Sequence, residues 1–518
     1  RGRTYHFRVT SGQFSGMAWP MEHIGATAAI WPGLSIKDHA RAAIQFLSGD
    51  PPERQVYTHL GWRDIAGKHL YLHAGGAIGS VGPVPDLEAA LSSDLQLYAL
   101  PDPPTGVDLL DAVRASLRLL EVAGDGVVFP VYCAIWRSIL GGCDSGLHLF
   151  GQTGGGKSEL AALAQQHFGA GLDSRHLPGN WSSTDNALES LAFAAKDAML
   201  VVDDFCPSGS TYDVQAMHRK ADRLFRAQGN TSGRQRLRPD GTPRPVKPPR
   251  GMVLSTGEDV PKGQSLRARV LVVEVPREGP DSLDWLALPS CQENAVDGLY
   301  AQALAGYLRW LASRYEEIQT ELKTKIFQLR EQAYQSGHHR RTPDIVANLA
   351  VGFSYFLDYA QEVGGVDKIQ ADDLRQRCWD ALGKAASAQG EHQVDSDPVA
   401  RFLELLSSAL GSGRAHLADA DGGAPYEPKA WGWREVEIGT GTYARSDFQA
   451  QGERIGWLDD GELYLQADTA YASAQNLARA EGDNLSVTLA TLKRRLQDQG
   501  FLASVEQTGD KERLVVRR

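Results

Sequence analysis

The amino-acid sequence predicts an α/β protein in which helices flank a parallel sheet. Between residues 124 and 275, short apolar runs alternate with helical segments, which is typical of parallel strands joined by crossover helices. Between residues 295 and 410, apolar residues recur at helical spacing almost throughout. The 518 residues suffice for about three or four domains. With 42% hydrophobic and 23% charged residues, the chain is neither a disordered nor a collagen-like protein.

Residues 1–104 are expected to form a small mixed α+β accessory domain that is rich in strands. Alternating runs begin at Tyr5 and at Lys68, and glycines and prolines separate such runs. A proline-rich segment at 101–104 closes this region. An amphipathic helix is then expected over residues 106–123.

A glycine-rich segment at 151–158 fits the spacing GxxxxGK[ST] without a gap. An apolar run precedes it and a helix-prone run follows, as in a phosphate-binding loop. Backbone N–H groups of such a loop surround phosphate oxygens, the lysine contacts the β- and γ-phosphates, and the hydroxyl binds magnesium. We therefore expect ATP and Mg²⁺ as cofactors. The expected nucleotide-binding residues are Gly151, Gln152, Thr153, Gly154, Gly155, Gly156, Lys157 and Ser158.

Two carboxylates end the next strongly apolar run, 198–204. A buried strand with acids at its carboxyl end can place them beside a magnesium ion and an attacking water. We assign Asp203 to the magnesium ion, together with Ser158, and Asp204 to polarising the water. Many motor ATPases have glutamate at the second position. Because aspartate is one methylene shorter, the water would have to lie closer.

Further polar candidates follow two more apolar runs. Ser255 and Thr256 end the run 251–254, and either side chain is a candidate for contacting the terminal phosphate or its water. Arg267 and Arg269 precede the run 270–275, where an arginine finger would enter the nucleotide site of a neighbouring subunit. Arg341 starts a helix of the helical region and is a candidate for a second phosphate-sensing arginine. A strand-end turn and solvated arginines are the alternatives.

The order of these features indicates an AAA+ P-loop ATPase. A phosphate loop alone would fit kinases and GTPases equally well, whereas the arginine before the last strand and the helical lid favour a ring-forming motor. We expect the ATPase core over residues 105–290 and the lid over residues 291–415.

A basic insertion separates the acid-bearing run from the polar one. Its segment 229–250 contains the turn signal Pro-Asp-Gly-Thr, which predicts a β-hairpin. The window 219–250 holds ten Lys or Arg residues against two acids, a net charge of +8. Such a hairpin would enter the channel of a ring and bind nucleic-acid phosphates; a disordered basic loop is the alternative. The expected DNA-binding residues are Arg234, Arg236, Arg238, Arg244 and Lys247.

Residues 430–518 are expected to form a winged-helix domain. A short strand at 463–465, helices at 467–480 and 485–499, and a two-stranded wing after residue 501 give this pattern. The second helix carries Lys493, Arg494 and Arg495, which are candidates for DNA contacts. Contact with another protein is the alternative role of this domain.

The chain resembles the MCM-like AAA+ helicases of mobile genetic elements, which include the self-loading replicative helicases of staphylococcal cassette elements and related phage primase–helicases. The likeness rests on the runs GQTGGGKS, VVDD, STGED, LRARVLVVEV, RRTPDIVANLAVGF and, near the N-terminus, HLGWR. It implies a homohexamer that hydrolyses ATP and threads single-stranded or forked DNA past the hairpin, with a primase or polymerase as a candidate partner. It assigns the family's catalytic roles to Lys157, Ser158, Asp203, Asp204, Thr256 and Arg269.

Other functions stay open at this level. One is an AAA+ replication initiator or DNA-packaging ATPase without processive unwinding, and another is a protein-remodelling AAA+ ATPase. The net charge of -11 argues against a protein coated with nucleic acid, but the basic window shows that the charge is unevenly distributed. Polypeptide-threading motors carry an aromatic pore loop, and the basic hairpin has no aromatic residue.

The five cysteines form no CxxC pair, which indicates reduced thiols in a cytoplasmic compartment and no structural zinc site. The longest apolar stretch, 127–136, is too short for a membrane-spanning helix. We therefore expect a cytoplasmic protein without a membrane partner.

Overall fold

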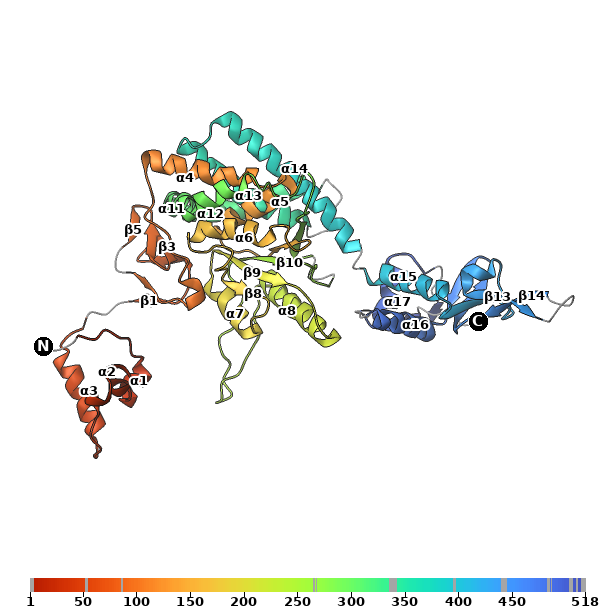
Figure 1. The fold of residues 1–518 in the computed structure, drawn as a ribbon, viewed down its shortest axis with the longest axis horizontal. Helices are drawn as coiled ribbons and strands as arrows, with labels where there is room; N and C mark the ends of the chain where they lie inside the picture. Colours follow the sequence, from red (N-terminus) through yellow and green to blue (C-terminus); the bar gives the residue numbers. More distant parts are fainter. Residues whose placement is uncertain are drawn as a thin grey trace. The chain divides into compact units, whose positions relative to one another are not determined.

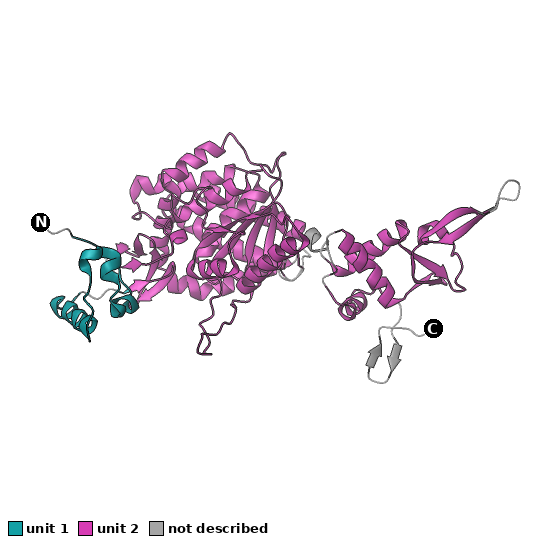
Figure 2. Ribbon diagram, turned by 60° about the horizontal axis from the view of Figure 1, so that its bottom comes forward, with its two compact units in different colours: residues 1–55 teal, residues 56–518 magenta. Residues whose placement is uncertain are grey.

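The computed structural model forms two compact units, residues 1–55 and residues 56–518 (Figure 2). None of the helices in the described part of the chain is long and apolar enough to cross a membrane. The structure describes all residues except 1–3, 52–54, 85–86, 264–265, 267, 335–341, 395–396, 439–444, 482–484, 486, 503–505, 509–510 and 514–518.

The first unit is helical, so the expectation of strands in this part of the chain is wrong. Its α-helices are α1 (Ser11–Gly16), α2 (Trp19–Ile24) and α3 (Ile36–Leu47). In α3 the apolar residues Ile36, Ala40, Ile44 and Leu47 recur at helical spacing. This period of 3.6, rather than the alternation around Tyr5, determines the local structure.

Strands follow at the start of the second unit: β1 (Val56–Tyr57), β2 (Gly61–Ile65), β3 (Lys68–His73), β4 (Gly76–Gly79), β5 (Gly82–Val84) and β6 (Glu88–Ala89). Strands β2 to β5 pair antiparallel in chain order, and β1 pairs parallel with β6. Trp62 fixes this layer because its indole N–H donates to the Ile139 carbonyl (2.9 Å) and its backbone N–H to the Asp197 carboxylate (3.0 Å). These strands therefore share the core of the following α/β region, and the structural boundary lies at residue 55 instead of the expected 104.

In the described part of the chain, the central sheet has five parallel strands in the order β11-β7-β10-β9-β8. They are β7 (Gly146–Phe150), β8 (Gly179–Asn180), β9 (Met199–Phe205), β10 (Met252–Gly257) and β11 (Val270–Glu274). Strand β10 lies between β7 and β9, which precede it in the chain. The carboxyl ends of β7, β9 and β10 therefore meet at one edge, where open α/β sheets bind their ligands.

Helices cover both faces of this sheet (Figure 1). On one face lie α5 (Asp125–Ile139) and α6 (Lys157–Gln165), and on the other α7 (Asp185–Ala194) and α8 (Thr211–Gly229). The remaining helices of this region are α4 (Gly106–Arg118), α10 (Leu288–Val296), α11 (Leu299–Ala312), α12 (Tyr315–Tyr334), α13 (Thr342–Glu362) and α14 (Lys368–Val394). Helix α13 packs on α5, where the rings of Phe356 and Trp136 stack at 3.7 Å.

The basic insertion after α8 pairs with itself in antiparallel fashion. The Arg238 N–H donates to the Thr242 carbonyl and the Arg244 N–H to the Arg236 carbonyl, both at 2.7 Å. An isolated bridge joins Leu237 to Pro243. Figure 1 shows this segment extending beyond α7 and α8.

The C-terminal region has its own hydrophobic core, which includes Phe402, Leu417, Ile455 and Leu492. The core begins with α15 (Pro398–Gly411), so this helix packs with the C-terminal region and not with the expected lid. Its strands β12, β15 and β16 form one sheet, and β13 and β14 form a ribbon that the sequence pattern did not predict. The elements are α15 (Pro398–Gly411), β12 (Ala415–Asp419), β13 (Trp433–Ile438), β14 (Arg445–Ala450), β15 (Glu453–Asp459), β16 (Glu462–Leu465), α16 (Ala467–Ala480), α17 (Leu489–Asp498), β17 (Glu506–Thr508) and β18 (Lys511–Arg513).

Candidate nucleotide-binding site

The glycine-rich segment 151–156 joins the end of β7 to the start of α6. Gly151, Gly154 and Gly156 have φ angles of 149°, 80° and 82°, a region that side chains rarely adopt. A Cβ atom on Gly151 would collide with the Val275 carbonyl, and one on Gly156 with the Leu283 side chain. The loop therefore needs glycine for its backbone conformation and for the approach of the segment after β11.

Lys157 is the first residue of α6, and its side chain folds back over the loop. Its ammonium group donates to the carbonyls of Gly151 (2.9 Å) and Gln152 (2.8 Å). Burial lowers the pKa of Lys157, and the nearby carboxylates of Glu258, Asp203 and Asp204 oppose this shift. The ammonium group therefore places a positive charge on the concave side of the loop.

Polar side chains from α6, β9 and β10 meet beside the loop. The Ser158 hydroxyl donates to Asp203 Oδ1 at 2.8 Å, and the Thr256 hydroxyl donates to the same oxygen. The Asp204 backbone N–H donates to the Thr256 hydroxyl oxygen at 3.2 Å. Four of the residues predicted from the sequence thus lie in one hydrogen-bonded group, although up to 98 positions separate them in the chain.

Asp204 has an unusual backbone. Its φ angle is 69°, in the left-handed region, which aspartate tolerates better than most residues. The pairing of β9 with β10 shifts register at the same place, between Ser255 and Gly257. Asp203 is half-buried, whereas Asp204 is exposed. Local strain of this kind is common at functional sites, where it directs a side chain.

The two candidates at the end of β10 lie in different surroundings. Both side chains are buried, but Thr256 contacts Asp203, whereas Ser255 accepts a hydrogen bond from the Trp181 indole N–H at 2.8 Å. The Ser255 hydroxyl also lies 3.0 Å from His148 Nδ1. Successive side chains of a strand point to opposite faces, so only Thr256 points into the polar group.

His148 makes the stability of the fold dependent on pH. Burial lowers its pKa from 6.5 to about 4. Between these values the unfolded chain binds the proton and the folded chain does not, so stability falls as the pH falls through this window. Urea unfolding at about pH 7.5 and about pH 5 measures the drop in the free energy of unfolding between these values. We expect this drop to be about 2 kcal/mol smaller in His148→Gln than in the wild type. Equal losses in both proteins would contradict this role of His148.

Glu258 belongs to the site but is absent from the residues predicted from the sequence. Its carboxylate accepts a hydrogen bond from the Thr153 hydroxyl, which lowers the pKa of Glu258. The Cys206 thiol lies 3.4 Å from the other carboxylate oxygen. Glu258 immediately follows β10, so the convergence of parallel strand ends at one edge was the signal that could have found it.

Arg269 lies at the opposite end of the sheet from the loop. Its guanidinium donates to the Asn230 side chain at 2.9 Å, and its carbonyl accepts from the N–H of Gly146, where β7 begins. The length of β11, about 16 Å for five residues, separates it from the loop of the same chain. Arg267 and Arg341 lie outside the residues that the structure describes.

The predicted DNA-binding side chains of the insertion differ in their contacts. Arg236 donates to the side chains of Glu189 (3.2 Å) and Asn186 (2.8 Å) on α7. Arg234, Arg238, Arg244 and Lys247 are exposed, and Lys247 lies 3.5 Å from the Ser190 hydroxyl. Arg236 therefore anchors the insertion on α7 and is less available to bind a phosphate than the sequence suggested.

The basic side chains of α17 do not form a uniform surface. Arg494 is exposed, whereas Lys493 and Arg495 are half-buried next to the core residue Leu492. Arg494 is thus the most accessible of these three positions.

A parallel sheet with a glycine-rich loop and carboxylates at its carboxyl edge, covered by many helices, defines a mixed α/β protein. A solved structure described as "SCCmec type IV Cch - active helicase" has a similar fold, with a TM-score of 0.52 and 13% identity over 90% of this chain and 80% of that chain. A family model described as "Domain of unknown function (DUF927)" matches residues 126–247. A comparison with curated proteins gives no significant match.

Proposed function

We propose that this chain is an ATP-dependent DNA helicase of the AAA+ class that works as a homohexameric ring, in the replication of a mobile element or phage. One observation carries the proposal: Lys157, Ser158, Asp203 and Thr256 meet at one edge of the sheet, next to the glycine-rich loop. The similar fold of a protein described as an active helicase supports the same function.

The polar group fits a magnesium ion as well as a triphosphate. Mg²⁺ usually keeps several waters and takes one or two protein oxygens. Ser158 Oγ and Asp203 Oδ1 lie 2.8 Å apart and would hold it. When bound, the ion would neutralise charge on the transferred phosphate. Lys157 would exchange its loop carbonyls for phosphate oxygens, and the exposed Asp204 carboxylate would accept a hydrogen bond from the attacking water.

The position of Arg269 supports a ring. Because β11 separates it from the loop of its own chain, this arginine would act on the nucleotide of a neighbouring subunit. Its hydrogen bond to Asn230, one residue after α8, would connect that contact to the start of the basic insertion. Exposed arginines on the insertion would bind the phosphates of DNA in the channel.

Arg269→Ala is expected to give rings with at least about 100-fold lower ATP turnover, because a finger arginine stabilises the transition state in trans. Mixing with Lys157→Ala subunits should restore part of the activity, since some interfaces then combine an intact loop with an intact Arg269. Steady-state ATPase assays of the single and mixed proteins measure this. Complementation by Arg267→Ala instead of Arg269→Ala would assign the finger to Arg267.

Strand displacement on a labelled forked DNA with ATP tests the proposed function. Displacement is expected from a helicase. An initiator or packaging ATPase would show DNA-stimulated ATP turnover without displacement, and a protein-remodelling ATPase would show turnover that DNA does not change.

A further inference from the structure

A groove of about 640 Å³ lies along α8, outside the nucleotide site. Arg219, Arg223 and Arg226 line it from the helix, and Arg234 lines it from the start of the basic insertion. We call it the arginine groove. Its wall is completed by Asp222, Ala227, Ser232 and Gly233. All of its arginines are exposed.

The arginine groove has a strong excess of positive charge. Its arginines contribute four positive charges against the single carboxylate of Asp222, which leaves +3. Asp185 pairs with Arg223 and lowers the local charge to +2, and Asp222 already pairs with Arg226 at 2.7 Å. Like charges four residues apart on a helix, such as those of Arg219 and Arg223, repel one another and destabilise it. A bound anion would remove this repulsion.

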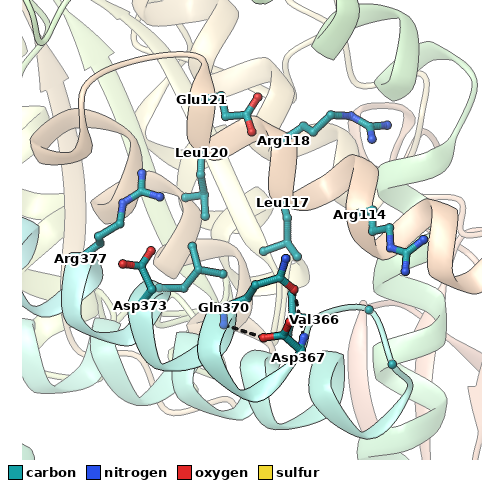
Figure 3. Close-up of a pocket in the computed structure, with 13 residues that line it drawn as sticks. Arg114, Leu117, Arg118, Leu120, Glu121, Val366, Asp367, Gln370, Asp373 and Arg377 are labelled. Atoms are coloured by element: carbon teal, nitrogen blue, oxygen red, sulfur yellow. Dashed lines mark hydrogen bonds between the residues drawn. The ribbon is translucent and has the colours of Figure 1, made fainter.

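A second groove, of about 830 Å³, provides a contrast (Figure 3). It lies between α4 and the start of α14, and Figure 3 shows Arg377 and Asp373 side by side there. The arginines of this groove are balanced by acids, and Arg377 also pairs with Asp125 at 2.8 Å. Its charged lining residues are Arg114, Arg118, Arg377, Glu121, Asp367 and Asp373. This neutral lining does not favour an anion.

Arg234 indicates which anion the arginine groove would take. This residue belongs both to the groove and to the first arm of the insertion. Arg238 and Arg244, farther along the insertion, are also exposed. A chain of phosphates bound along the insertion could therefore continue into the groove without a break. Guanidinium groups can bind phosphate oxygens through two parallel hydrogen bonds.

We propose that the arginine groove binds the phosphodiester backbone of DNA where the strand leaves the basic insertion. This inference rests on the proposed function. The same phosphate chemistry could come from the triphosphate of a neighbouring subunit, so the test includes DNA-free ATP turnover as a separate measurement.

The test measures binding of a fluorescein-labelled single-stranded oligonucleotide by anisotropy between about 50 and about 200 mM salt. The full chain with Arg219→Gln and Arg226→Gln keeps the Arg223–Asp185 pair. Each lost phosphate contact lowers the log–log salt slope by about 0.7, so the double variant should lose about 1.4, with roughly tenfold weaker binding at low salt. The control, Arg314→Gln with Arg375→Gln, removes two paired arginines elsewhere and should keep the wild-type slope.

An unchanged slope in the groove variant would overturn the inference. A fall in DNA-free ATP turnover with an unchanged slope would also overturn it and assign the groove to the neighbouring nucleotide. Both outcomes leave the proposed function intact. Absence of DNA binding by the wild type would instead contradict the proposed function itself.

Discussion

Replacing Lys157 by alanine is expected to lower ATP turnover by at least about 100-fold, because a positioned positive group on the transferred phosphate contributes that much to catalysis. The ammonium group lies over the loop, where its contacts are two backbone carbonyls. Its loss removes the positive charge from the loop. Steady-state phosphate release by the purified chain measures the effect.

A loss of folding must be distinguished from a loss of catalysis. Two hydrogen bonds from a charged ammonium group are worth about 3–6 kcal/mol together, a small part of the folding enthalpy of so large a unit. Lys157→Ala should therefore keep its far-ultraviolet circular dichroism and lose a few degrees in Tm. Lys384→Ala, which removes an exposed lysine on α14, should retain wild-type turnover. Substantial turnover by a folded Lys157→Ala protein would show that this loop is not the site of ATP hydrolysis.

Replacing Arg234, Arg238 and Arg244 together by alanine is expected to abolish strand displacement while DNA-free ATP turnover remains. These exposed side chains lie on the insertion, which contacts α7, whereas the loop residues lie between β7 and α6. Three lost phosphate contacts would lower the log–log salt slope of single-strand binding by about 2. We expect the remaining DNA contacts to be too weak for translocation. A strand-displacement assay beside an ATPase assay measures both effects.

Two further variants serve as comparisons for the Arg234, Arg238 and Arg244 variant. The triple variant Arg114→Ala, Arg314→Ala, Arg375→Ala removes the same charge from α4, from the turn between α11 and α12, and from α14, and it should unwind DNA normally. Arg236→Ala removes an anchor to α7, so it should weaken unwinding by loosening the insertion. Full unwinding by the Arg234, Arg238 and Arg244 variant would show that unwinding does not require DNA binding by these arginines of the insertion.

Features that depend on neighbouring residues could be predicted from the sequence. The helix expected over 467–480 has those bounds as α16, and the apolar run 147–150 lies within β7. The positions of Lys157 at the start of α6 and of Asp203 near the end of β9 followed from the same local patterns.

Features that depend on distant partners could not be predicted. The residue pattern alone did not distinguish Thr256 from Ser255, although the family resemblance favoured Thr256, because the choice depends on which face of β10 packs against Trp181. The left-handed backbone of Asp204 arises where β9 shifts register against β10, and no local pattern encodes that shift. The ribbon of β13 and β14 is an exception, because its strands pair locally and only residues 439–444 separate them. The glycines and threonines of 439–442 were a loop signal that could have found it.

A count of charges in the sequence does not show which basic residues are paired with acids. The window 219–250 has a net charge of +8, but several of its arginines pair with acids, such as Arg223 with Asp185 and Arg226 with Asp222. The structure thus divides the basic residues into anchors, such as Arg236, and exposed groups that remain available for an anion.

Strand displacement on a forked DNA, with the polarity recorded, tests the central claim most directly. We expect ATP-dependent release of the labelled strand by the wild type and none by Lys157→Ala. ATP turnover that DNA leaves unchanged, with no strand released, would contradict it.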